Sequence, residues 1–371
     1  MNSPDEAAVR AALSTVIDPE LRRPIDELGM LADVALDGGR VTVRVLLTIA
    51  GCPLRGTIDA DVRAALAAVP GVDKIAIELD VMTPEQRQAL RDRLRPVRGI
   101  PFTRPESLTK VFAVASGKGG VGKSSVTVNL ACELASRGLR VGVIDADVHG
   151  FSVPALMGIT QGPTRVEDMI LPPVAHGVKV ISIGMFVTGN QAVAWRGPML
   201  HRALEQFLTD VYFGDLDVLF LDLPPGTGDV AISVSQLLPS AQLLIVTTPQ
   251  AAAADVAERA GSVSAQTGQR VAGVVENMSA MTLPDGSVLE VFGSGGGERV
   301  AARLSEVLDA PVPLLGKVPL DVALREGGDA GVPIVLRSPD SPSAAALKAV
   351  ASRLASAPRG LAGRNLGVAP R

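Results

Sequence analysis

The chain has 371 residues, enough for one large and one small domain. Hydrophobic residues make up 47% of it, so it can bury a substantial core, and its formal net charge of −4 argues against a protein that coats nucleic acid. The N-terminus lacks a secretory signal, and no apolar run approaches the ~18–20 residues of a membrane span. With two widely separated cysteines and no disulfide framework, the sequence favours a cytoplasmic protein with neither nucleic acid nor a membrane as partner.

Residues 1–95 are predicted to form a small α+β domain. Two strands flank Gly38 and Gly39, and the second alternates polar and apolar residues, which is typical of a β-hairpin. Thr83 and Pro84 suit the cap and first turn of a closing helix. The elements expected here are a helix over 6–16, strands over 31–36 and 40–49, a helix over 53–69, a strand over 73–81 and a helix over 83–94.

A larger α/β domain is expected over residues 110–357. Short apolar strands alternate with helices there, and such runs suit strands that are buried on both faces of a sheet. Right-handed crossovers through the helices give a doubly wound, mostly parallel sheet. The expected strands are 110–116, 140–146, 178–184, 217–223, 241–248, 270–277 and 313–319. Residues 96–109 are Pro-rich and predict a linker, and the Gly- and Arg-rich residues 358–371 predict a disordered tail.

GKGGVGKS, from Gly117 to Ser124, matches the phosphate-binding pattern G-x-x-x-x-G-K-[ST] between a predicted strand and a predicted helix. Glycines let backbone N–H groups turn toward phosphate oxygens, and the helix N-terminus adds positive potential. Lys123 is expected to bridge the β- and γ-phosphates of a nucleotide, and Ser124 to bind Mg²⁺. The nucleotide-binding residues expected from this P-loop are Gly117, Lys118, Gly119, Gly120, Val121, Gly122, Lys123, Ser124 and Ser125.

Three carboxylates follow predicted strands of the same sheet: Asp145, Asp147 and Asp222. Ligands of doubly wound sheets bind at the carboxyl ends of the strands, so all three are expected to converge on the loop. Asp222 fits the Walker-B role of holding Mg²⁺. Asp147 is placed to orient an attacking water, while Asp145 either holds a water of the Mg²⁺ shell or braces the site.

The loop carries a second lysine, Lys118, that the phosphate pattern does not require. In this the chain resembles the deviant-Walker ATPases, the family of MinD, ParA and the nitrogenase iron protein, whose mark is K-G-G-V-G-K-[ST]. In that family the lysine crosses a dimer interface to the partner's nucleotide. The resemblance therefore implies a nucleotide-bridged homodimer with Lys118 among the catalytic residues. From the residues alone, a solvated surface lysine is the alternative.

Residues 192–230 resemble the Mrp/ApbC branch of that family, the iron–sulfur cluster carrier ATPases, as do DADVHGFSVPALMG, VVENMS and LGKVPLDVALREGGDAGVPI. The resemblance implies that Asn277 contacts the adenine base of ATP and that Pro319 lies in the segment bordering it. Residues 1–95 resemble the small domain often fused ahead of this ATPase, which carries DPE and T-x-x-x-C-P, here at 18–20 and 48–53. ATP, Mg²⁺, a second copy of the chain and apo iron–sulfur client proteins are the implied ligands and partners.

Cys52 is the candidate iron–sulfur ligand. It falls between a predicted strand and a predicted helix, where the helix dipole favours a thiolate; the alternative is a small buried residue beside Pro53. Most carriers of the family have C-x-x-C after the ENMS motif, and two such pairs would hold a [4Fe–4S] cluster across a dimer. This chain has a predicted hairpin turn, Leu283–Gly286, in that place. Either Cys52 holds a labile cluster together with a client's ligands, or the protein assists assembly without its own cluster.

The sequence therefore predicts a dimeric Mg²⁺-dependent ATPase that binds and transfers iron–sulfur clusters or assists their assembly. One alternative is a positioning ATPase of the MinD/ParA type, although the C-terminal tail lacks a membrane-binding amphipathic helix. Another is a nucleotide-gated module that binds clients without a cluster of its own. A redox role like that of the nitrogenase iron protein is least favoured, because the chain lacks the cluster ligands that this chemistry requires.

Overall fold

The computed structural model describes residues 4–49, 54–94, 99–148, 150–186, 197–226, 229–250, 259, 263–283 and 285–356. Contacts divide the chain into two compact units: the first is Met1–Arg98 with Thr164–Leu171, and the second is Gly99–Pro163 with Pro172–Arg371. The first unit is thus discontinuous in sequence, whereas the sequence predicts one continuous small domain. Within the described ranges, no helix combines the length and apolar character that crossing a membrane requires.

The first unit contains a three-stranded sheet in the order β1–β2–β3. β1 (Leu31–Asp37) and β2 (Arg40–Leu47) form the predicted hairpin, and β3 (Lys74–Val81) pairs with β2 in parallel after a crossover through α2 (Arg55–Ala67). Alternate residues of β2 are completely buried, because one face of the sheet packs on the core. These three strands and α2 confirm the predicted elements.

Two further helices complete the predicted elements of the first unit, α1 (Glu6–Leu13) and α3 (Pro84–Leu94). Thr83 and Gln86 form a capping box at the start of α3: the Gln86 N–H donates to Thr83 Oγ1 at 3.3 Å, and the Thr83 N–H donates to Gln86 Oε1 at 2.9 Å. The unit also contains a short hairpin that the sequence did not predict, formed by β6 (Thr164–Val166) and β7 (Met169–Leu171). This hairpin comes from the middle of the chain.

The second unit is built on an eight-stranded sheet in the order β15–β12–β11–β4–β10–β5–β9–β8. Every pairing is parallel except that of β8 (Val174–Ala175) with β9, so the predicted doubly wound, mostly parallel sheet is confirmed. All seven predicted strands are present: β4 (Lys110–Ala115), β5 (Val141–Asp145), β9 (Val178–Ser182), β10 (Val218–Asp222), β11 (Gln242–Thr247), β12 (Val271–Glu276) and β15 (Leu314–Lys317).

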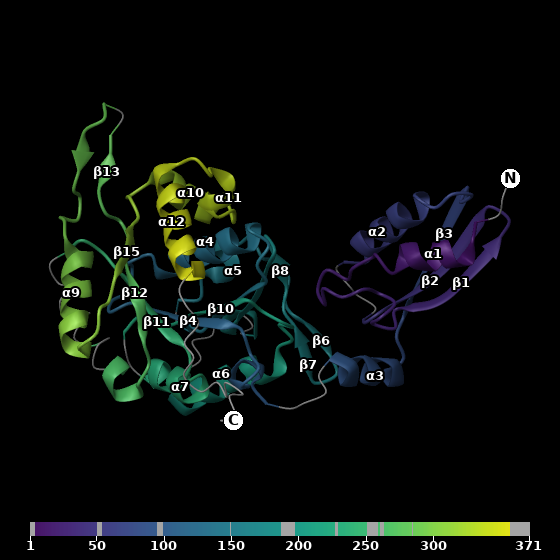
Figure 1. Ribbon diagram of the computed structural model, residues 1–371, viewed down its shortest axis with the longest axis horizontal. Helices are drawn as coiled ribbons and strands as arrows, with labels where there is room; N and C mark the ends of the chain where they lie inside the picture. The colour runs from purple at the N-terminus through teal and green to yellow at the C-terminus, as the bar shows by residue number, and fades with distance from the viewer. Residues whose placement is uncertain are drawn as a thin grey trace, which may run out of the picture. The chain divides into compact units, whose positions relative to one another are not determined.

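Helices cover both faces of this sheet (Figure 1). α4 and α12 lie together on one face, and α6 and α7 on the other. Between them, Phe112 on β4 and Phe220 on β10 stack with ring centroids 5.6 Å apart. The helices of the second unit are α4 (Lys123–Ser136), α5 (Val153–Leu156), α6 (Gly197–Asp210), α7 (Asp229–Leu237), α9 (Gly296–Leu308), α10 (Val322–Asp329), α11 (Ile334–Arg337) and α12 (Pro342–Ser356), with the 3₁₀ turns Pro101–Thr103 and Ile183–Phe186.

Part of the predicted linker packs into the second unit. Pro101–Thr103 forms a 3₁₀ turn, and Phe102 is buried edge-on against Phe213 with ring centroids 6.0 Å apart. The Pro-rich composition suggested a free linker, but one buried aromatic ring is enough to fix this turn. The predicted disordered tail lies outside the described residues.

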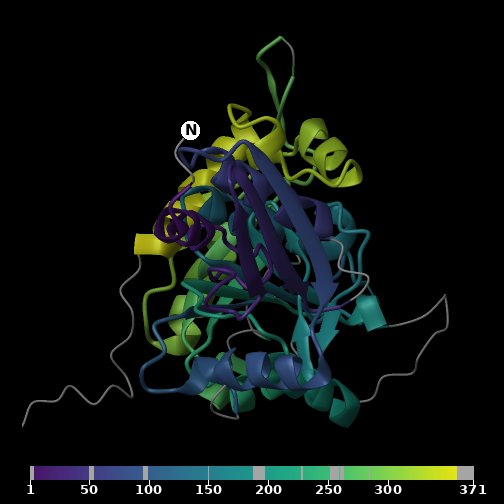
Figure 2. The ribbon, with the colours of Figure 1, turned by 90° about the vertical axis from the view of Figure 1, so that its right-hand side faces the viewer.

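The hairpin expected after the ENMS motif is present. β13 (Met281–Thr282) pairs with β14 (Val288–Leu289), and the Gly286 N–H donates to the carbonyl of Leu283 at 2.9 Å. Figures 1 and 2 show this hairpin projecting from the rest of its unit. Val288 and Leu289 are 64% and 49% exposed, as expected for a two-stranded projection without a covering layer.

Candidate functional site

The loop between β4 and α4 follows the phosphate-binding pattern. Gly120 and Gly122 both have a φ of +76°, in the left-handed region that favours glycine. Gly122 is also the N-cap residue of α4, and a Cβ there would lie 2.3 Å from Nδ2 of Asn277. Both the turn and the approach of Asn277 therefore require glycine at this position.

The loop borders a cavity of about 530 Å³, a size typical of small-molecule sites. The cavity is lined by Ser116, Gly119, Gly120, Val121, Gly122, Lys123, Ser124, Ser125, Asp147, Gly150, Ser152, Leu156, Pro224 and Pro225. The fold thus brings Asp147 to the same cavity as the loop. Of the other predicted residues, Asp145 and Asp222 lie behind this lining, at the ends of neighbouring strands.

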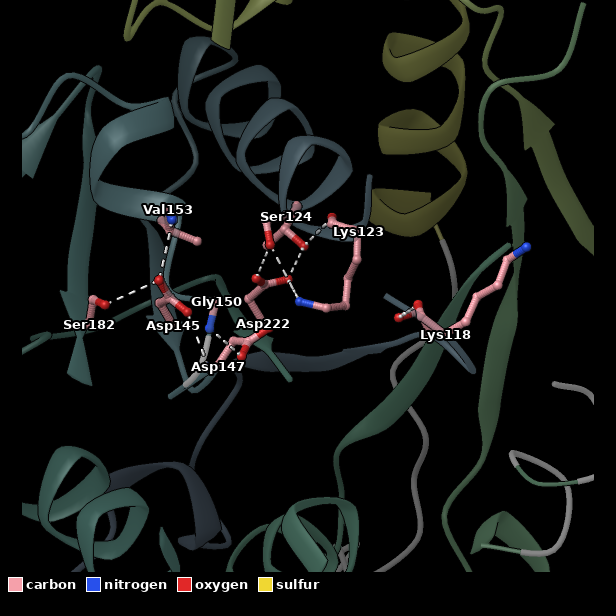
Figure 3. Close-up of polar contacts among 11 residues, drawn as sticks. Lys118, Lys123, Ser124, Asp145, Asp147, Gly150, Val153, Ser182 and Asp222 are labelled. Atoms are coloured by element: carbon pink, nitrogen blue, oxygen red, sulfur yellow. Dashed lines mark hydrogen bonds and ion pairs between the residues drawn. The ribbon is translucent and has the colours of Figure 1, made fainter. Parts of the chain in front are cut away.

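Lys123, Ser124 and Asp222 meet at the base of the loop (Figure 3). Lys123 Nζ lies 2.7 Å from Asp222 Oδ1, and Ser124 Oγ donates a 2.5 Å hydrogen bond to Asp222 Oδ2. Asp222 is completely buried, and Lys123 is 6% exposed. A buried ion pair is favourable only when other polar groups satisfy the carboxylate, and Ser124 contributes to this.

Thr127 is a member of this cluster that sequence reasoning missed. Its Oγ1 donates to Asp222 Oδ1 at 3.0 Å, and the residue is completely buried. Thr127 lies four residues after Lys123, so both point from the same face of α4. That spacing from Lys123 was the available signal.

The carboxylate of Asp145 is held by hydrogen bonds from two backbone N–H groups and one hydroxyl. Its Oδ1 accepts from the Asp147 N–H at 3.2 Å, and its Oδ2 accepts from the Val153 N–H at 3.2 Å and from Ser182 Oγ at 3.1 Å. Burial, and next the charge of Asp222, raise the pKa of Asp145 to about 7. Of the two roles left open by the sequence, these contacts favour the brace.

Asp147 forms part of the cavity wall. Its Oδ1 accepts from the Gly150 N–H at 2.9 Å, and the residue is buried. A Cβ at Gly150 would lie 3.2 Å from Asp147 Oδ2, so the small residue leaves room for the carboxylate. This loop fixes a negatively charged oxygen beside the phosphate-binding residues.

Lys118 points away from Lys123 and Asp222 (Figure 3). Its amine donates to Oε1 of Gln250, and its carbonyl accepts from Ser116 Oγ at 3.0 Å. The residue is half-buried. Within one chain, its amine therefore takes no part in the buried cluster.

Asn277 lies behind the loop, at the end of β12. Its Nδ2 donates to the Val121 carbonyl at 2.9 Å, while its Oδ1 is buried and finds no hydrogen-bond partner among the described residues. The preceding Glu276 fixes this position: its Oε1 accepts from Ser279 Oγ at 2.7 Å and its Oε2 from the Gly297 N–H at 2.6 Å. Glu276 is a second residue that the sequence analysis did not single out. The carbonyl of Pro319, the remaining predicted contact, accepts from Ser343 Oγ at 3.3 Å.

Of the two cysteines, Cys132 alone is among the residues that the structure describes. Cys52 lies outside the described residues. Cys132 is completely buried in the core beside α4's other apolar residues, and burial raises the pKa of its thiol to about 12. In the part of the chain that the structure describes, no three His, Cys, Asp or Glu side chains group as metal ligands.

Two family models match the chain. One is described as a NUBPL iron-transfer P-loop NTPase and matches residues 107–355; the other, described as an iron–sulfur cluster assembly protein, matches residues 6–79. Among solved structures, a nucleotide-binding protein from Archaeoglobus fulgidus in complex with ADP is 33% identical, with a TM-score of 0.52 over 62% of this chain and 91% of that one.

Curated relatives match over nearly the whole length. A protein of Mycobacterium tuberculosis named iron–sulfur cluster carrier protein is 62% identical over 370 residues, covering 98% of this chain and 97% of the relative. A Bacillus subtilis protein of the same name is 41% identical over 318 residues, covering 85% of this chain and 88% of the relative. The loop, the sheet and these matches together establish that the chain belongs to the NUBPL-type iron-transfer P-loop NTPases, with an iron–sulfur assembly domain at its N-terminus.

Proposed function

We propose that this chain is a Mg²⁺-dependent ATPase that delivers iron–sulfur clusters to apoproteins or assists their assembly, in a reducing compartment such as the cytoplasm. The observation that carries the proposal is the buried cluster of Lys123, Ser124 and Asp222 at the base of the loop. In this cluster the ammonium of Lys123 can bind phosphate, and the oxygens of Ser124 and Asp222 can bind a divalent cation. The cargo is inferred from relatives that are named iron–sulfur cluster carrier proteins.

Lys123 is the phosphate-binding cation. It lines the cavity and is held there by its ion pair with Asp222. Nucleotide phosphate entering the loop gives the ammonium a second anionic partner, while the glycine backbone supplies N–H donors. Lys123 then exchanges its bond to Asp222 for bonds to the β- and γ-phosphates.

Ser124 and Asp222 fit a magnesium ion. The hydroxyl of Ser124 and Oδ2 of Asp222 lie 2.5 Å apart, and oxygen donors of this kind are the ligands that Mg²⁺ prefers. These two residues would hold the ion, which supplies neutralising charge to the phosphates. The contacts of Asp145 to Val153 and Ser182 leave it the supporting role.

Asn277 supports a preference for ATP over GTP. Its amide is oriented by the bond to Val121, and its Oδ1 is a buried acceptor with no donor among the described residues. Buried acceptors are nearly always satisfied, so a ligand that donates there is favoured. Adenine carries an amine at the position where guanine carries a carbonyl oxygen.

Asp147 is the candidate for orienting the attacking water. Its carboxylate is anchored through Gly150 and borders the cavity that holds the phosphate loop. General-base or water-positioning groups of this kind contribute typically ~10²–10⁴-fold to turnover. Binding of the nucleotide itself does not require Asp147.

Lys118 supports a homodimeric active form. Its amine points away from its own chain's cluster, and it donates to the uncharged amide oxygen of Gln250, which an anionic phosphate of a second chain's nucleotide can replace. In the dimer, each Lys118 then adds one cation to the partner's site.

The experiment that tests the function is anaerobic reconstitution with iron and sulfide, followed by transfer to an apo [4Fe–4S] enzyme with and without Mg-ATP. Wild type, Cys52→Ala and the matched control Cys132→Ala are compared for iron retained per dimer and for client activity restored. Iron lost only in Cys52→Ala supports a carrier that uses Cys52. ATP-dependent restoration without retained iron supports an assembly factor. A wild-type protein that neither retains iron nor restores the client refutes the proposal.

A further inference from the structure

The β6–β7 hairpin is grouped apart from the sequence that surrounds it. It falls within residues 107–355, which match the P-loop NTPase family, yet its contacts group it with the first compact unit. The iron–sulfur assembly match ends at residue 79, before α3 begins at Pro84. The hairpin thus lies in the range of one family model, while α3 follows the range of the other.

The apolar side chains of the hairpin are buried. Val166 and Met169, which are cross-strand partners, are both 0% exposed, and Leu171 is 1% exposed. A two-stranded hairpin cannot bury its own residues to this extent, and it is marginal in water by itself. Among the described residues, none of these side chains belongs to the large hydrophobic core of the second unit.

Two ion pairs join α3 to the tip of the hairpin. Arg87 Nε lies 3.0 Å from Glu167 Oε1, and an Nη of Arg91 lies 3.1 Å from Asp168 Oδ1. The arginines are four residues apart, so they share one face of α3, and the two acids form the turn between β6 and β7. Glu167 adopts a φ of +54°, which is uncommon for a residue with a side chain. Charge complementarity thus selects this turn as the partner of α3.

Both ends of the segment that carries the hairpin return to one buried carboxylate of the candidate nucleotide site. Before the hairpin, Val153 donates its N–H to Asp145 Oδ2; after it, Ser182 donates its hydroxyl to the same oxygen. Ser152 and Leu156, which flank Val153, line the cavity. The cavity wall is therefore continuous with the chain that leads into the hairpin.

We propose that the Thr164–Leu171 hairpin is the element by which nucleotide binding controls the N-terminal unit, with the Arg87–Arg91 face of α3 as its docking surface. The inference rests on the proposed nucleotide site. Nucleotide that reorders the wall from Asp147 to Leu156 shifts the chain on one side of the hairpin, while Asp145 ties the other side to the sheet. The state of the cavity is thereby passed to α3 through the chain itself.

Hydrogen exchange on the full-length protein, with and without Mg-ADP, tests this in three peptides: the phosphate loop, α3 and the hairpin. We expect nucleotide to change exchange in all three in the wild type. Failure of the nucleotide site and failure of this inference give different results. A phosphate loop that Mg-ADP does not protect refutes the nucleotide site. A protected loop with unchanged exchange in α3 and the hairpin refutes this inference alone. This arm needs no variant, so it holds even if a variant fails to fold.

Charge reversal then identifies the contact. In Glu167→Arg/Asp168→Arg, we expect exchange in α3 and the hairpin to rise about tenfold, because two attractive pairs become repulsive, and the nucleotide response of α3 to disappear. Adding Arg87→Glu/Arg91→Glu restores opposite charges and the response. Arg325→Glu, a charge reversal on α10 at a residue 64% exposed, is the matched control. A nucleotide response that persists in the acid-reversed protein would contradict the assignment.

Discussion

The pair of Lys123 and Asp222 predicts that the usual test of a phosphate loop measures stability as well as binding. Lys123→Ala removes the cation that lies 2.7 Å from Asp222, a carboxylate with no exposed surface. The variant leaves a buried charge without its counter-ion. We therefore expect Lys123→Ala to lower the free energy of unfolding of the ligand-free protein, in addition to abolishing nucleotide binding.

The magnitude follows from what remains around Asp222. Breaking a buried pair by removing one partner costs ~3–5 kcal/mol. Ser124 and Thr127 continue to donate hydrogen bonds to both carboxylate oxygens, so the cost falls at the lower end, about 3 kcal/mol. For a unit of this size, that lowers the melting temperature by ~6–12 °C. Neutralising the carboxylate in Lys123→Ala/Asp222→Asn restores most of it, because an amide is satisfied by the same hydroxyls.

The assay is thermal unfolding without nucleotide of four proteins: wild type, Lys123→Ala, Asp222→Asn and the double variant. Equilibrium binding of ATP is measured on the same proteins. The expected pattern is a double variant that melts close to wild type yet binds no nucleotide. That result separates the phosphate-binding role of Lys123 from its structural role. A Lys123→Ala protein that melts with wild type would refute the buried pair. Equal ATP affinity in wild type and Lys123→Ala would refute the site assignment.

Three further predictions concern other residues of the site. Asp147→Ala keeps ATP affinity and loses at least ~10²-fold in steady-state turnover; parallel loss of affinity would contradict a water-orienting role. Asn277→Ala lowers the ratio of ATP to GTP affinity about tenfold, measured by competition binding, and an unchanged ratio would exclude Asn277 as the base-selecting acceptor. Because burial raises the pKa of Asp145 to about 7, folding retains a proton that the unfolded chain releases near pH ~4. Stability of the ligand-free protein should therefore fall as the pH rises from about 4 to 7, and Asp145→Asn should flatten that slope; an identical slope in melting temperature would overturn the assignment.

The sequence predicted the sheet of the second unit because its strands are buried on both faces. Runs such as Val218–Asp222 and Gln242–Thr247 are almost continuously apolar, and this signal does not depend on what lies next to them. The phosphate loop was equally accessible, since its glycines and lysines are contiguous in sequence. Its relation to Asp222 followed from one general rule, that strand ends meet at one edge of the sheet.

The features missed depend on distant partners. Thr127 has a role because it donates a hydrogen bond to Asp222, which is distant in sequence. Glu276 has one because it accepts a hydrogen bond from the Gly297 N–H, at the start of α9. The β6–β7 hairpin is the clearest case: Val166 and Met169 are buried, and the hairpin is grouped by its contacts with residues 1–98, far away in the sequence. No local pattern in Thr164–Leu171 contains that information. Cys52, on which the choice between carrier and assembly factor depends, lies outside the described residues.

Asp145 and Asp222 lie at the same register of the sheet but have different roles, because their hydrogen-bond and ion-pair partners differ. Asp145 and Asp222 pair directly across β5 and β10, and neither has exposed surface. Asp222 receives a lysine and two hydroxyls from α4, so it is tied to the element that binds phosphate. Asp145 receives only neutral donors, from the cavity wall and from β9, so it holds backbone in place. Burial, and next the like charge of Asp222, raise the pKa of Asp145, whereas its three hydrogen bonds oppose that shift. The pair thus divides the candidate site into a half that is joined to the phosphate-loop helix and a half that is joined to the segment leading into the hairpin.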